Sequence, residues 1–108
     1  MEAVARHGKR FRFEHLEARV VIAEREQSRV GFIVPKHGQS AVGRNRLRRR
    51  LREHVRLELL PRLSGTSGSA LDVVIRARPE AYRASPETIR AEMDRLLERV
   101  QKFRAAGA

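Results

Sequence analysis

The chain has 108 residues, a formal net charge of +11 and no cysteine. Its length fits one domain, residues 1–108, with one modest core, and the lack of cysteine excludes disulfides and thiolate metal sites. No apolar run could serve as a signal peptide or as a membrane span of about 20 residues, so a cytoplasmic location without a membrane partner is expected.

The N-terminal third predicts extended structure. Residues 1–10 are a short basic lead with at most one helical turn. The segment Phe11–Glu24 is rich in aromatic and β-branched residues, which favours a strand. Arg29–Val34 predicts the next strand, and the polar residues between the two predict an antiparallel hairpin. Pro35 and Gly38 then break the extended chain.

A long helix is predicted in the middle of the chain. Ser40 suits the N-cap, and the helix is expected to run to about Leu60, where Pro61 stops it. The segment Ser64–Ser69 has the composition of a flexible loop.

One more strand and one more helix complete the chain. In Leu71–Arg78, apolar residues alternate with a partly basic face that carries Arg76 and Arg78. Ser85 and Pro86 suit the N-cap and first position of the last helix. The order of elements predicts an α+β fold, a two-layer sandwich in which helices pack on a small, mostly antiparallel sheet.

The central helix concentrates positive charge. Arg44 to Arg56 contain seven arginines and one acid, Glu53. On a helical wheel, a narrow stripe of Leu47, Leu51, Val55, Glu58 and Leu59 is expected to dock on the sheet. Arginines four residues apart on the other faces repel one another, and a solvated face normally mixes both signs. The pattern therefore favours phosphate binding, helped by the positive end of the helix dipole.

Structured RNA is the favoured phosphate source. DNA readers commonly expose a short recognition helix on an all-helical scaffold, whereas this helix is long and tied to a sheet. The residues expected to contact RNA are Lys36, His37, Arg44, Asn45, Arg46, Arg48, Arg49, Arg52 and Arg56.

The segment "RVGFIVPKHGQSAVGRNRLRRRLREHVR" resembles the protein component of bacterial ribonuclease P. The family pattern is a "VG-x-x-V-x-K" strand, a short loop and "A-V-x-R-N-R" opening a long basic helix. Val30, Gly31, Val34 and Lys36 match the strand, and Arg44, Asn45, Arg46, Arg49 and Arg52 match the helix. The likeness extends from about Gly8 to the C-terminus.

The resemblance implies a fold and a role. It implies a left-handed crossover around the basic helix, and a protein subunit that joins a catalytic RNA, one protein per RNA. It implies that the RNA, with Mg²⁺, removes the 5′ leader from precursor tRNA. It also implies a cleft between the sheet and the basic helix that holds the single-stranded leader.

The chain departs from the family pattern around that cleft. Compared with the family pattern, a shortened N-terminal helix is expected, with Ala5 in place of a phenylalanine. Arg19 stands where an aromatic is usual, and the loop reads "PKHGQSAV". We therefore expect a leader cleft that uses charge more than stacking. Its candidate residues are Phe11, Phe13, Arg19, Arg76 and Arg78, with either base stacking or an edge-of-core position open to the two phenylalanines.

No set of residues suggests catalysis by the chain itself. The histidines His7, His15, His37 and His54 show no metal-ligand spacing, and the acids Asp72, Glu80, Glu92 and Asp94 read as strand-edge, loop and helix-surface residues. No catalytic residue and no protein-bound metal is expected. Two alternatives stay open: a ribosomal-type RNA-binding protein, and a self-sufficient nuclease.

Overall fold

A computed structural model describes residues 8–23, 27–64 and 70–107. Most of the predicted N-terminal lead and most of the predicted loop at 64–69 lie outside these ranges. Among the described helices, none combines the length and the apolar character that crossing a bilayer would require.

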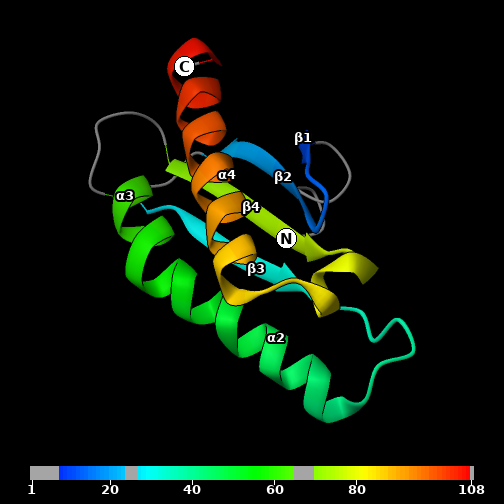
Figure 1. The fold of residues 1–108 in the computed structure, drawn as a ribbon. Coiled ribbons are helices and arrows are strands. Elements are labelled where there is room, and N and C mark those ends of the chain that lie inside the picture. The colour runs from blue at the N-terminus through cyan, green and yellow to red at the C-terminus, as the bar shows by residue number, and fades with distance from the viewer. Residues whose placement is uncertain (1–7, 24–26, 65–69, 108) are drawn as a thin grey trace.

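One mixed sheet is covered by helices on one face (Figure 1). Its strands are β1 (Lys9–Arg12), β2 (Leu16–Ala23), β3 (Arg29–Ile33) and β4 (Ala70–Ala77), in the order β1-β2-β4-β3. The helices are α2 (Ala41–His54), a π-helical turn (Val55–Leu59), α3 (Leu60–Ser64), a 3₁₀ turn (Pro79–Arg83) and α4 (Pro86–Gly107). The predicted α+β class is confirmed.

The predicted hairpin between the second and third strands is wrong. β4 lies between β2 and β3, antiparallel to the first and parallel to the second. β4 takes this central place because it is apolar on both faces, with Leu71 and Ile75 fully buried on one side and Val74 on the other. β3 begins and ends with exposed residues, Arg29 and Ile33, which suit a sheet edge.

The connection from β3 through α2 to β4 is left-handed. In Figure 1 both strands point the same way, the helices lie in front of the sheet, and the chain passes upward from β3 to β4. Most such connections in proteins are right-handed, so this handedness follows from the whole fold and not from local rules.

The predicted strand Phe11–Glu24 is two strands joined by a tight turn. The Phe13 N–H donates to the Leu16 carbonyl at 2.8 Å, and β1 and β2 pair on either side. Residues distant in sequence hold this turn. The Glu92 carboxylate accepts from the His15 and Leu16 N–H groups at 3.1 Å each, and the Arg78 guanidinium donates to the Phe13 carbonyl at 2.7 Å.

Pro61 does not stop the central helix. The helical run continues to Ser64, after a π-helical turn in which the Leu60 N–H donates to the Val55 carbonyl. The wider turn changes the hydrogen-bond register directly before Pro61, which has no N–H to donate.

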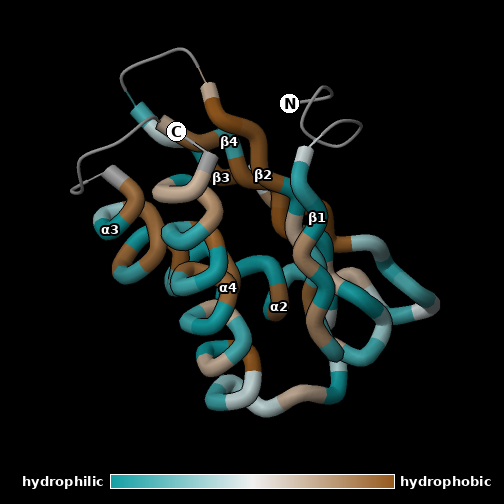
Figure 2. The backbone as a smooth tube through the Cα atoms, turned by 90° about the horizontal axis from the view of Figure 1, so that it is seen from above, coloured by the Kyte–Doolittle hydropathy of each residue, from teal (hydrophilic) through white to brown (hydrophobic). Residues whose placement is uncertain are grey.

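The core lies between the helices and one face of the sheet. Figure 2 shows hydrophobic segments along β2 and β4 facing α4. The buried set includes Phe11, Leu16, Val20, Leu47, Leu51, Val55, Leu59, Leu71, Val73, Ile75, Ile89, Met93, Leu96 and Val100. Glu92, expected on the helix surface, is instead 1% exposed within this core. That expectation was wrong because the carboxylate binds backbone groups of a distant turn.

Candidate nucleic-acid interface

The start and the docking face of α2 follow the sequence prediction. The Ser40 hydroxyl accepts from the Gly43 N–H at 3.1 Å, which makes Ser40 the N-cap. The predicted apolar stripe is buried at Leu47, Leu51, Val55 and Leu59, while Glu58 stays exposed. Docking by these leucines and valine turns the remaining faces of the helix to solvent.

The solvent-exposed faces of α2 carry a concentration of positive charge. The exposed members of the predicted RNA-contact set are Asn45, Arg46, Arg49, Arg52 and Arg56. Of these five side chains, Arg56 alone forms an ion pair with another described residue, Glu53, at 2.8 Å. Arg46, Arg49 and Arg52 present guanidinium groups to solvent, where they can donate paired hydrogen bonds to phosphate oxygens.

Two predicted contact residues are less available. Arg44 and Arg48 are half-buried along the edge of the docking stripe. The Arg44 Nε donates to the Val34 carbonyl at 2.6 Å, so this side chain ties the first turn of α2 to the end of β3. Replacing Arg44 would therefore disturb the local fold as well as any RNA contact.

The loop before α2 presents Lys36 and His37. The Gln39 N–H donates to the Lys36 carbonyl at 2.8 Å across a turn in which His37 and Gly38 have φ of 48° and 78°. Two consecutive residues with left-handed backbone angles define a type I′ turn, and glycine at position 38 adopts such angles without strain. The Tyr82 hydroxyl donates to the Pro35 carbonyl, which anchors the loop. Lys36 and His37 are exposed beside the α2 N-terminus.

The face of the sheet opposite the helices is a second basic surface. A groove of about 210 Å³ on this face is lined by Glu17, Ala18, Arg19, Ile33, Val74 and Arg76. Strand register adds Arg10 and Arg12 to the same face, opposite Arg19 and Glu17. We call this the open sheet face.

One acid in this groove has a perturbed pKa. A hydrogen bond from Arg10 at 2.9 Å lowers the pKa of Glu17, against the opposing effect of partial burial, and the charges of Arg10, Arg12 and Arg76 lower it further. Glu17 is therefore an ionised carboxylate at neutral pH. It offsets part of the positive charge of the groove.

The structure separates the predicted leader-cleft residues. Arg19 and Arg76 share the open sheet face. Phe11 is buried on the other face, 6.2 Å from the Phe103 ring, which places it in the core. Arg78 is engaged with the turn before β2.

Phe13 belongs with the helix layer. Its ring lies 6.0 Å from the Arg95 guanidinium and 5.8 Å from that of Arg99, both on α4. Core leucines of α2 and of the turn after it pack toward the sheet, so the described residues leave no open cleft on the docking side of α2. The open sheet face lies on the opposite side.

Sequence reasoning missed Arg10 and Arg12. The signal was present in "KRFR", because side chains alternate between the two faces of a strand. With Phe11 buried on one face, both arginines lie on the open sheet face.

Among the described residues, no three His, Cys, Asp or Glu side chains group in a way that would hold a metal ion.

Comparisons with known proteins agree with this geometry. A family model described as Ribonuclease P matches residues 1–101. A ribonuclease P protein component from Arthrobacter sp. strain FB24 is 41% identical over 83 residues, which cover 77% of this chain and 57% of the relative. Another from Acidothermus cellulolyticus is 35% identical over 103 residues, covering 92% and 80%. The chain matches little more than half the length of the Arthrobacter relative.

A solved structure shares the fold. The RNase P protein from Thermotoga maritima superposes with a TM-score of 0.72 at 26% identity, covering 91% of this chain and 88% of that one. The two chains thus share the fold over most of their lengths.

Proposed function

The chain belongs to the ribonuclease P protein family, and from that premise we propose that it is the protein subunit of a ribonuclease P. In this role it binds the catalytic RNA and the 5′ leader of precursor tRNA, and it assists removal of the leader in the cytoplasm. In this proposal, which rests on membership of the family, the RNA subunit carries out the hydrolysis with Mg²⁺.

The exposed arginines of α2 carry this proposal. An exposed helix face with one sign of charge is unfavourable for the isolated protein, because like charges four residues apart repel. A polyanion removes that repulsion and releases its own counterions on binding. Arg46, Arg49 and Arg52 together with Lys36 supply this surface.

The open sheet face is the proposed leader site. It is basic, grooved and separate from the arginines of α2, so catalytic RNA and leader can be bound at the same time. Arg19 and Arg76 point to the same groove from neighbouring strands, where Val74 and Ile33 add apolar area. A single strand of RNA suits this combination of backbone charge and apolar contact.

Replacing Arg19 and Arg76 together by alanine is expected to weaken the preference of the holoenzyme for precursor over mature tRNA, by about tenfold at low salt. The effect is expected to shrink as salt rises, because phosphate contacts are screened. Equilibrium binding of both tRNA forms across a salt series measures it. Phe13→Ala is the comparison variant, since that ring lies on the helix side; if Phe13→Ala alone abolished the preference, the leader site would lie elsewhere.

The alternative function is that of a ribosomal-type RNA-binding protein. A binding experiment can distinguish it from a ribonuclease P subunit. The matched test compares affinity for a ribonuclease P RNA with affinity for a structured RNA of equal length at the same salt. We expect tighter binding to the ribonuclease P RNA, and equal affinity for both would favour the alternative.

A further inference from the structure

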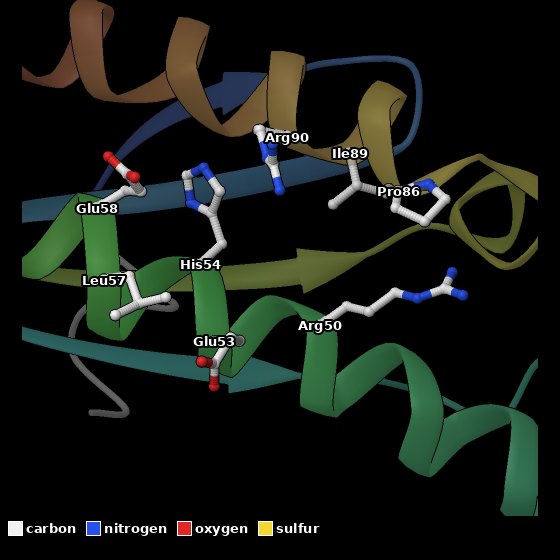
Figure 3. Close-up of a pocket in the computed structure, with 8 residues that line it drawn as sticks. All are labelled: Arg50, Glu53, His54, Leu57, Glu58, Pro86, Ile89 and Arg90. Atoms are coloured by element: carbon white, nitrogen blue, oxygen red, sulfur yellow. The ribbon is translucent and has the colours of Figure 1, made fainter.

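A groove between α2 and α4 lies apart from both surfaces described above (Figure 3). It has a volume of about 290 Å³ and is lined by Arg50, Glu53, His54, Leu57, Glu58, Pro86, Ile89 and Arg90. This volume lies just below the usual range for small-molecule sites, roughly 300–1,000 Å³. The groove therefore suits one nucleotide and is too small for a duplex.

The charges of the groove do not cancel. Glu53 is paired with Arg56 at 2.8 Å, and Glu58 with Arg62 at 3.3 Å, so both acids are already neutralised by neighbours on their own helical run. No ion pair of Arg50 or Arg90 occurs among the described residues. Arg50 and Arg90 therefore line the groove from different helices without an ion pair of their own, which favours an anion, and the Asp94 carboxylate is the further acid beside His54.

A buried imidazole adjoins the groove. The His54 side chain is 10% exposed, and neither ring nitrogen has a hydrogen-bond partner among the described residues. The Nε2 atom lies 3.4 Å from the Asp94 carboxylate, without the alignment of a hydrogen bond. In Figure 3 the ring points from α2 toward α4. Unpaired polar groups of this kind are uncommon in folded proteins and mark sites that a ligand or water completes.

Apolar side chains form the rest of the lining. Leu57 is 56% exposed, and Pro86 is also exposed on the opposite wall. Ile89 is buried beneath them. These groups offer a nucleobase an apolar contact surface next to the two arginines.

We propose that the α2–α4 groove binds one unpaired nucleotide of the partner RNA. Its phosphate contacts Arg50 and Arg90, and its base packs on Leu57 and Pro86, with His54 as the polar group below. This site rests on the proposed function, since it requires an RNA partner. It adds a third contact with RNA, in the groove between α2 and α4.

The test uses full-length protein and ribonuclease P RNA. Arg90→Ala is expected to weaken RNA affinity about fivefold and to reduce the slope of log affinity against log salt by about 0.7–0.9. Lys102→Ala is the matched control, because it removes one positive charge from the same helix away from the groove and leaves both values near wild type. Leu57→Ala is expected to weaken affinity about threefold with the salt slope unchanged.

Cross-linking locates the nucleotide directly. The chain has no cysteine, so Leu57→Cys carries a photoreactive group at one site. The Leu57→Cys variant is expected to cross-link to an unpaired nucleotide of the RNA. The Lys102→Cys variant, labelled in the same way, is expected to give no such cross-link. If wild type binds and activates the RNA while Arg90→Ala and Leu57→Ala match Lys102→Ala, the groove proposal is overturned and the proposed function stands. If wild type fails to bind, the proposed function itself fails.

Discussion

Replacing Glu92 by alanine is expected to lower the free energy of unfolding by about 3–5 kcal/mol. The Glu92 carboxylate is buried, accepts hydrogen bonds from the His15 and Leu16 N–H groups, and contacts Nδ1 of the His15 ring. Alanine leaves these buried donors without partners and opens a cavity in the core. Urea unfolding followed by circular dichroism measures the change as a shift in midpoint at constant slope.

Glu92→Gln is the control for this prediction. It keeps the shape and one carbonyl acceptor, so a loss of about 1–2 kcal/mol is expected, smaller than for alanine. A loss below about 1 kcal/mol for Glu92→Ala would contradict the role of this carboxylate in holding the β1–β2 turn.

Replacing Arg46 and Arg49 together by alanine is expected to weaken binding to ribonuclease P RNA by about 10- to 100-fold. Both side chains are exposed, and neither belongs to the docking stripe, so the fold should persist. Two lost phosphate contacts should lower the slope of log affinity against log salt by about 1.4–1.8. Binding titrations at several salt concentrations measure both quantities.

The double lysine variant separates charge from geometry. Arg46→Lys with Arg49→Lys retains both charges but loses the paired hydrogen bonds of the guanidinium, so a normal salt slope with weaker affinity is expected. Unchanged affinity and slope in the alanine variant, with the fold intact, would place the RNA surface elsewhere.

Local signals in the sequence were sufficient for the basic helix. The Ser40 cap, the stripe through Leu47 and Leu51, and the arginines on the remaining faces each depend on residues within a few positions of one another. Helical periodicity and capping act over this range, which is why the start of the helix and the apolar part of its docking stripe were predicted correctly, whereas its end at Pro61 was not.

Strand order was beyond local signals. The hairpin between β2 and β3 was wrong because β4, some 40 residues further along the chain, pairs with both. Competition for the central position depends on which strand is apolar on both faces. That comparison involves the whole sheet, and strand propensity alone does not decide it.

Side chains that act at a distance were also missed. Glu92 and Arg78 hold a turn of the first hairpin through contacts 76 and 65 residues apart, with Leu16 and Phe13 respectively. In sequence they resemble ordinary charged surface residues. For Phe11 and Phe13 the sequence left base stacking and an edge-of-core position open, and the packing of α4 on their side of the sheet favours the core position.

Leader removal from precursor tRNA, measured with and without the catalytic RNA, tests most directly whether this chain assists an RNA catalyst. Rigorously RNA-free protein is expected to release no leader at any Mg²⁺ concentration. Added to a matching ribonuclease P RNA, it is expected to restore processing at low Mg²⁺, where the RNA alone is slow. Metal-dependent leader release by the RNA-free protein would contradict this division of labour, as would an RNA whose activity the protein leaves unchanged.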